Sequence, residues 1–328
     1  MNPILAAIFL PSALLEMFSL APVSIPDSGM PSTTPDMLFA SPTRLDHIGR
    51  IVAPVMIDGK GPFRFIIDTG ASSSTISPQL ALQLGLNPAT QSAMVVNGIT
   101  GTAQVPSVAI GRLEAGDLVI QETRFPVVWA PLMAGADGIL GIAGLRQESV
   151  FVDFRHNHVV ISRSLRDADR IGFDKVPATV LGDGLMAVAA RVGGVAVQAI
   201  IDTGSERSLG NAALHDALYA KRGNQGQEPE TTSVYGATTD IASGEVHLVP
   251  TITLGPVNMS NVTVVFGDFH IFQVWNLVDR PAVIIGMDVL GTVESLGIDF
   301  KRSQIYFETA ERARDPNFGR SGRTWRAE

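Results

Sequence analysis

The tripeptide Asp-Thr-Gly occurs twice in this chain, at residues 68–70 and 202–204. An Ile-Ile pair precedes each copy, at positions 66–67 and 200–201. At ordinary amino-acid frequencies, one such tripeptide is expected about once in ten chains of this length. A matched pair therefore indicates an internal duplication, in which each half supplies one aspartate to a shared site.

The sequence around the two copies also matches. Upstream, residues 55–67 and 190–201 each show a strand, a glycine-containing turn and a second strand. Downstream, Gly-Ile-Leu-Gly at 138–141 corresponds to Val-Ile-Ile-Gly at 283–286. A further strand, polar turn and strand then follow in each half. This self-similarity predicts an all-β protein built from two copies of one unit, with few short helices.

The repeat predicts an N-terminal lobe at residues 46–163 and a C-terminal lobe at residues 176–309, joined by a charged linker at 164–175. Short helices are expected at 78–86, with Ser77 as N-cap, and at 212–222. Residues 24–45 are rich in Pro, Ser and Thr, and residues 310–328 are basic. Both of these segments are expected to be disordered.

Residues 1–23 are mostly apolar and predict a signal peptide or a membrane anchor. No Lys or Arg precedes Arg44, so the basic region of an ordinary signal is missing. Pro11 and Glu16 weaken the anchor interpretation. We expect an exported, periplasmic or extracellular protein, which contacts a membrane only through this segment. A membrane tether and a buried or disordered arm are the alternatives.

Composition excludes several functions. The net charge of −8 argues against a nucleic-acid partner. The absence of cysteine excludes disulfides, thiolate catalysis and cysteine-based zinc sites. His156 and His158 could present two imidazoles to a metal, but the equivalent turn at 301–304 has no such ligands. We therefore expect a structural turn there, and neither a metal nor a cofactor.

Two aspartates that reach one water can perform acid–base chemistry together. Like charges at that distance do not both ionise easily, so the pair tends to share one proton. The ionised carboxylate can take a proton from the water while the protonated one polarises a carbonyl. We therefore expect Asp68 and Asp202 to be the catalytic residues.

The rest of each Asp-Thr-Gly loop fits this role. Glycine permits a tight turn and close backbone approach, and each threonine hydroxyl can bond the backbone of the opposite loop. A serine also follows the second copy. The residues expected to support the two loops are Thr69, Gly70, Thr203, Gly204 and Ser205.

Two further sets of residues are expected near the aspartates. The segments at 138–141 and 283–286 should pack beneath the loops as a hydrophobic floor, made of Ile139, Leu140, Gly141, Ile284, Ile285 and Gly286. Two hairpins at 95–102 and 233–239 are either mobile flaps over the substrate or ordinary surface hairpins. The flap residues would be Gly98, Ile99, Thr100, Gly101, Tyr235, Gly236 and Ala237.

With these motifs in place, residues 46–309 resemble aspartic proteases. Each half is similar to one subunit of the retropepsin type, which normally dimerises, and the tandem order also resembles the bilobal pepsin-like enzymes. The resemblance implies two β-barrel lobes related by a pseudo-twofold axis, with a cleft between them. It also implies hydrolysis of polypeptides by a water activated between Asp68 and Asp202, without a covalent intermediate. Because one chain carries both loops, we expect a monomer.

The chain departs from the pepsin pattern in ways that leave alternatives open. Pepsin-like enzymes have Ser or Thr after each Asp-Thr-Gly, whereas Ala71 follows the first copy here. The Ser205 hydroxyl could bond the Asp202 carboxylate, and Arg207 could hold that carboxylate ionised if it turned inward. These asymmetries motivate the alternative of a catalytically weak or inactive peptide-binding protein. A third alternative places each half in a separate intermolecular dimer.

Overall fold

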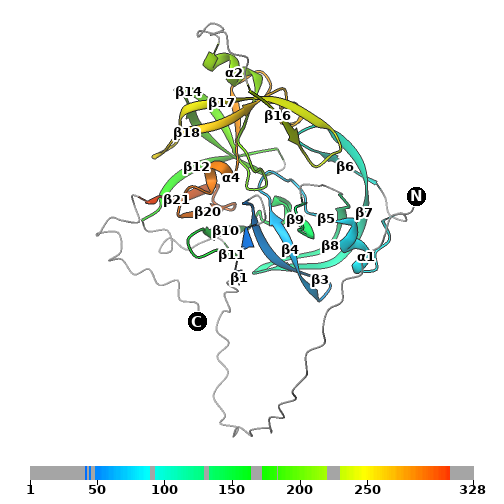
Figure 1. Ribbon diagram of the computed structural model, residues 1–328. Coiled ribbons are helices and arrows are strands. Elements are labelled where there is room, and N and C mark those ends of the chain that lie inside the picture. The colour runs from blue at the N-terminus through cyan, green and yellow to red at the C-terminus, as the bar shows by residue number, and fades with distance from the viewer. Residues whose placement is uncertain are drawn as a thin grey trace, which may run out of the picture. The chain divides into compact units, whose positions relative to one another are not determined.

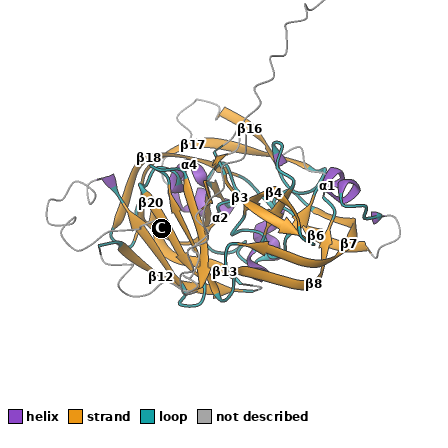
Figure 2. Cartoon of the chain, turned by 90° about the horizontal axis from the view of Figure 1, so that it is seen from below, coloured by secondary structure: helices purple, strands orange, loops and turns teal. Residues whose placement is uncertain are grey.

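The computed structural model describes residues 41–42, 44–45, 49–88, 93–128, 133–163, 172–182, 184–219 and 230–310. These residues belong to one compact unit. Strands dominate it, and its helices are short (Figures 1 and 2). The predicted signal at 1–23, most of the linker at 24–45 and most of the tail at 310–328 lie outside the described residues.

The first half of the chain forms an 8-stranded sheet among the described residues, with the order β5-β9-β4-β3-β7-β6. β2 is added against β3, and β8 against β7. The strands are β2 (Arg44–Leu45), β3 (Ile51–Ile57), β4 (Lys60–Ile67), β5 (Thr75–Ile76), β6 (Ala93–Asn97), β7 (Thr102–Ala115), β8 (Leu118–Pro126) and β9 (Gly138–Leu140).

The second half forms most of a 13-stranded sheet among the described residues, in the order β1-β11-β10-β20-β21-β12-β13-β14-β19-β15-β18-β17-β16. Its strands are β1 (Ser41–Pro42), β10 (Glu148–Asp153), β11 (His158–Arg163), β12 (Asp174–Leu181), β13 (Leu185–Val192), β14 (Val195–Ile201), β15 (Leu209–Gly210), β16 (Glu230–Tyr235), β17 (Ile241–Leu254), β18 (Val257–Phe266), β19 (Ala282–Ile285), β20 (Ser295–Asp299) and β21 (Gln304–Glu308).

The all-β prediction is confirmed, and the repeat is visible strand by strand. β4 runs parallel to β9 in the first half, and β14 runs parallel to β19 in the second. The hairpin before each Asp-Thr-Gly turns at a dipeptide with positive φ, Asp58-Gly59 and Gly193-Gly194, as two-residue hairpins require. Each half is thus one copy of the same curled unit.

The two halves are joined by a continuous sheet. The final hairpin of the first half, β10–β11, lies against the final hairpin of the second half, β20–β21. β10 and β20 pair antiparallel, with Val150 opposite Ile298 and Val152 opposite Leu296. Buried residues of both halves belong to one continuous hydrophobic core.

Ordered structure differs from the sequence expectation at its edges. β1 pairs with β11 and β2 pairs with β3, so strand pairing begins inside the segment expected to be a disordered linker. β12 likewise begins within the predicted linker at 164–175, because residues 174–177 pair with β21. Short backbone ladders hold these residues although their composition does not favour strands.

The helices are α1 (Pro78–Gln83), α2 (Ala212–Tyr219), α3 (His270–Val274) and α4 (Met287–Leu290), and Ile142–Gly144 forms a 3₁₀ turn, η3. The Ser77 hydroxyl caps α1 by accepting from Leu80 N, as predicted. α1 ends earlier than predicted because Gly85 takes φ +78°. The amides of Gly85 and Leu86 then donate to Leu82 and Ala81, which closes a Schellman motif. The second predicted helix is described only as far as Tyr219.

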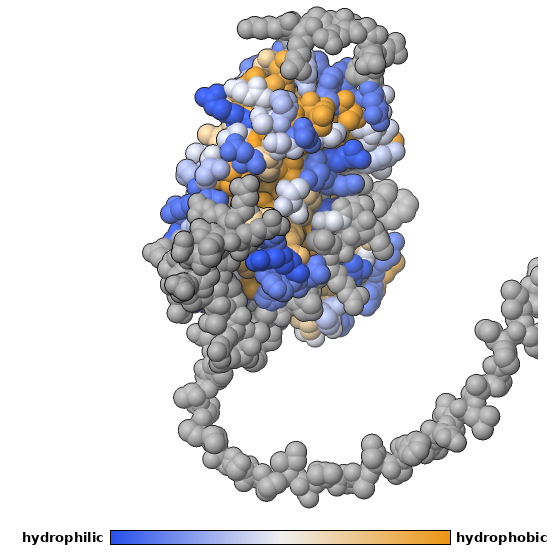
Figure 3. Space-filling view, turned by 60° about the vertical axis from the view of Figure 1, so that its left-hand side comes forward, coloured by the Kyte–Doolittle hydropathy of each residue, from blue (hydrophilic) through white to orange (hydrophobic). Residues whose placement is uncertain are grey.

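Hydrophobic and hydrophilic residues are interspersed on the face seen in Figure 3. Within the described ranges, no helix has the length and apolar character needed to cross a membrane.

Candidate active site

The two Asp-Thr-Gly loops begin where β4 and β14 end. The amide of Asp68 donates to the Leu140 carbonyl on β9, and the amide of Asp202 donates to the Ile285 carbonyl on β19, both at 3.0 Å. Each parallel strand pair therefore holds one aspartate at its carboxyl end. The apolar pairs before the aspartates are fully buried, which anchors both loops in the core.

The two threonines connect the loops to each other. The Thr69 hydroxyl donates to the Ile201 carbonyl and the Thr203 hydroxyl donates to the Ile67 carbonyl, each at 2.7 Å. Each hydroxyl also accepts the amide of the opposite threonine, at 3.1 and 3.2 Å. Both side chains are completely buried. This reciprocal set of four bonds links the two loops across the pseudo-twofold axis, and the predicted bonds from each threonine hydroxyl to the opposite backbone are confirmed.

The two glycines bring each loop against the opposite carboxylate. A Cβ atom placed on Gly70 would overlap the carboxylate of Asp202, and one placed on Gly204 would overlap the carboxylate of Asp68. Neither glycine has a positive φ. Both positions therefore require glycine because it lacks a side chain, and not because of an unusual backbone angle.

Both carboxylates accept the same backbone bonds. Asp68 Oδ1 accepts the amides of Gly70 and Ala71 at 2.9 Å, and Asp202 Oδ1 accepts the amides of Gly204 and Ser205 at 2.9 and 3.1 Å. The expectation that the Ser205 hydroxyl bonds the Asp202 carboxylate is wrong. That hydroxyl instead donates to the Arg207 carbonyl at 2.8 Å, because the turn folds it back toward its own loop.

Burial raises the pKa of both aspartates above the ordinary value for this residue. For Asp202, burial is reinforced by the neighbouring charge of Asp68, and its pKa is raised well above that value. For Asp68, bonds from Gly70, Asp202 and Ala71 and the positive charge of Arg50 draw the pKa part of the way back down. The pair can therefore hold one proton, with the negative charge favoured on Asp68.

The cation that acts on this pair is not the one that the sequence suggested. Arg207 lines the same cavity, but its charge lowers the pKa of Asp288 and is not among the influences on Asp202. Arg50 is buried, lines the cavity and acts on Asp68. It lies just before β3 in a segment with no motif, so no local pattern indicates it.

The predicted floor residues lie mainly beneath the loops. Gly141 lies against the backbone of Ser73, and its amide donates to the Ser74 hydroxyl. Gly286 lies against the backbone of Arg207, and its amide donates to the Ser208 hydroxyl.

The apolar floor residues differ in their access to the cavity. Ile139 lines the cavity, but Leu140, Ile284 and Ile285 are fully buried. Leu209 on β15, the cross-strand partner of Ile284, lines the cavity.

The two predicted flaps are hairpins, β6–β7 and β16–β17, and their tips meet (Figure 1). The Thr100 and Thr238 hydroxyls lie 3.1 Å apart, and Gly98 contacts the backbone of Ala237. The Ile99 carbonyl accepts the Ile271 amide on α3 at 3.4 Å. The first flap therefore contacts the second half of the chain at two places, the tip of the second flap and α3.

The aspartates and flap tips enclose a cavity of about 250 Å³. Of the predicted flap residues, Gly98, Ile99, Tyr235, Gly236 and Ala237 line it. Thr100 and Gly101 do not. Thr100 faces the second flap, and Gly101 lies against the Asp240 carboxylate.

A family model described as aspartyl protease matches residues 53–143 and 188–289. The two matched regions contain the two Asp-Thr-Gly loops and cover more than half of the chain. The chain belongs to the aspartyl protease family. No curated protein is similar enough in sequence to match it.

This aspartyl protease has an apolar cavity wall that its motifs do not reveal. Ile271 on α3 and Trp275, which follows α3 directly, line the cavity beside Leu209, Val234 and Val265. All five come from the second half of the chain, whereas the first half contributes Ile99, Met133 and Ile139. The sequence signal for this wall is the short run at 266–275, which contains four aromatic residues.

Of the two histidines singled out in the sequence, His156 lies in the turn between β10 and β11, and His158 begins β11. His156 Nδ1 lies 2.8 Å from the Asp153 carboxylate, and His158 lies opposite Asp153.

Proposed function

We propose that this protein is an aspartic endopeptidase that hydrolyses peptide bonds with a water held between Asp68 and Asp202. One observation carries the proposal: two buried carboxylates lie on threonine-linked loops, each against the glycine of the opposite loop, beneath two meeting flaps. This arrangement suits acid–base chemistry shared between two halves.

In this mechanism Asp68 is ionised and Asp202 carries the shared proton. Asp68 takes a proton from the water as its oxygen attacks the carbonyl carbon, and Asp202 gives its proton to the carbonyl oxygen. The tetrahedral gem-diol then collapses: Asp68 gives its proton to the amide nitrogen, Asp202 takes a proton from a gem-diol hydroxyl, and the C–N bond breaks. A carboxylic acid and an amine leave, and no covalent intermediate forms with the protein.

The substrate we propose is an extended polypeptide. Flap hairpins offer main-chain hydrogen bonds to an extended chain, and pockets beside them select alternate side chains. The wall formed by Ile271, Trp275 and Leu209 suits a large apolar side chain next to the cleaved bond. Glu206 and Arg207 lie on the exposed rim, where they can contact polar substrate residues.

The setting of this activity is also part of the proposal. The apolar N-terminal segment supports export, with the periplasm or the exterior of the cell as the site of action and a membrane tether as the alternative. A monomer suffices, because one chain supplies both aspartates.

The test incubates purified protein with an unstructured polypeptide across a range of pH, with and without a statine-type analogue of the gem-diol. Cleavage sites are mapped by mass spectrometry. We expect cleavage beside large apolar residues that the analogue blocks.

A peptide-binding protein without turnover would bind the same substrate and leave it intact. Of the features that motivated this alternative, the Ser205 hydroxyl donates to the Arg207 carbonyl, and the Arg207 charge lowers the pKa of Asp288. Binding of the polypeptide without any cleavage between acidic and neutral pH would overturn the proposal.

A further inference from the structure

Three potential metal ligands converge on the outer side of the second half, apart from the residues that line the active-site cavity. His215 lies on α2, and Glu245 and His247 lie two residues apart on one face of β17. All three side chains are partly buried. Among the described residues, this is the group of His and acidic side chains whose ligand atoms meet closely enough to share an ion.

The distances suit a tetrahedral ion. Glu245 Oε2 lies 3.1 Å from His247 Nε2 and 3.6 Å from His215 Nε2, and all three ligand atoms lie within 4.8 Å of one another. Ligands bound at 2.0–2.2 Å in a tetrahedron are roughly 3.3–3.5 Å apart. Small side-chain adjustments would therefore place an ion between them. Two imidazoles and one carboxylate are a donor set that zinc prefers.

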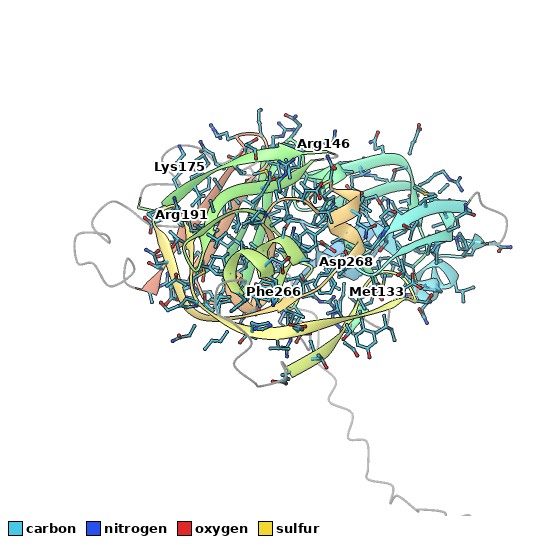
Figure 4. All side chains as sticks on the ribbon, turned by 90° about the horizontal axis from the view of Figure 1, so that it is seen from above. Met133, Arg146, Lys175, Arg191, Phe266 and Asp268 are labelled. Carbon is cyan, nitrogen blue, oxygen red and sulfur yellow. The ribbon has the colours of Figure 1, made fainter. Side chains whose placement is uncertain are left out.

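The surroundings resemble the outer shell of a metal site. The other ring nitrogen of His215, Nδ1, lies 3.4 Å from the Asp216 carboxylate, which would orient Nε2 toward the ion. Tyr219 stacks on His247 with a centroid separation of 4.7 Å. Phe266, labelled in Figure 4, lies 5.6 Å from both imidazole rings. These rings restrict solvent and limit the freedom of both histidines.

We infer that His215, Glu245 and His247 form a structural site for one divalent transition-metal ion, Zn²⁺ by donor type, with water as the fourth ligand. β17 is the returning strand of the second flap, so the ion would fasten the base of that flap to α2. The ion has no part in peptide hydrolysis, and the inference holds whether or not the protein cleaves peptides.

The experiment titrates tag-free, chelator-treated full-length protein with Zn²⁺ by calorimetry and with Co²⁺ by visible spectroscopy. We expect one Zn²⁺ per chain and a tetrahedral Co²⁺ spectrum that Zn²⁺ abolishes. Replacing His247→Gln or Glu245→Gln should weaken binding by at least roughly tenfold. Amide exchange in β16 and β17 should slow when Zn²⁺ binds.

His156→Gln is the matched control, since His156 also lies beside a carboxylate, that of Asp153, but belongs to no cluster of three potential ligands among the described residues. It should leave Zn²⁺ affinity unchanged. Circular dichroism checks that each variant folds, and the isosteric Glu245→Gln retains the shape of the site if a histidine variant does not. Equal Zn²⁺ affinity in wild type, Glu245→Gln and His247→Gln would overturn the site, as would loss of binding in His156→Gln alone.

Discussion

At the scale of single residues, the first question is what each carboxyl group contributes. Asp68→Asn and Asp202→Asn each remove one member of the acid–base pair and keep its volume. We expect kcat/KM for a polypeptide to fall by at least about 10²-fold in either variant. Exposed Asp279→Asn is the control and should keep full activity. Near-normal turnover in either active-site variant would contradict a shared pair.

The same variants should change stability in a pH-dependent way. The pKa of Asp202 is raised in the folded protein by burial and by the charge of Asp68. The carboxyl therefore destabilises the fold increasingly as pH rises from the ordinary aspartate pKa through the raised value. Asparagine does not titrate, so Asp202→Asn should melt at a higher temperature than wild type at neutral pH. The difference should vanish at low pH, which thermal unfolding across pH will check.

Arg50 should set the acidic limb of the activity profile. Its positive charge lowers the pKa of Asp68 relative to burial alone, and activity requires one ionised and one protonated carboxyl. In Arg50→Met the pKa of Asp68 should rise, so the acidic limb of kcat/KM should move to higher pH. Arg50→Lys keeps the positive charge, so the acidic limb should move less in that variant. An acidic limb at the same pH in Arg50→Met and wild type would contradict this role.

At the scale of elements, the proposed role of the β6–β7 hairpin as a flap over the substrate can be tested at its tip. Its tip reaches the second flap through Thr100 and reaches α3 through Ile99, and both residues are only partly buried. Deleting these two residues should lower kcat/KM on long peptides by roughly 10-fold to 100-fold, because the substrate loses its cover. The thermal midpoint should move by less than about 4 °C.

Val95→Ala is the control for this deletion, because Val95 lies on the same hairpin and is largely exposed. It should leave activity on long peptides unchanged. Unaltered cleavage of long peptides by the deletion variant would show that the hairpin is not a flap.

At the scale of the whole molecule, the two halves should unfold together. The β10–β20 ladder, the threonine cross-links and the shared core connect them. Differential scanning calorimetry should show one transition with calorimetric and van't Hoff enthalpies in a ratio of about 1. Two resolved transitions would mean that the lobes are independent domains. The sample is the full-length chain.

The sequence by itself determined the duplicated architecture and the central site. Asp68, Asp202, both threonine cross-links and both hairpin tips follow from local patterns: alternating apolar residues, turn dipeptides and a repeated tripeptide. The structure confirms these placements because each depends on contacts that the duplication itself specifies. A motif repeated in both halves meets its own copy across the pseudo-twofold axis.

Tertiary structure alone decided what breaks that symmetry. The direction of the Ser205 hydroxyl, the approach of Arg50 rather than Arg207, and the apolar wall of α3 all depend on packing between distant segments. So does the meeting of His215 with Glu245 and His247, which belong to a helix and a strand far apart in the chain. Local patterns carry no information about such contacts, because burial and side-chain direction are set by the neighbours that the completed fold supplies.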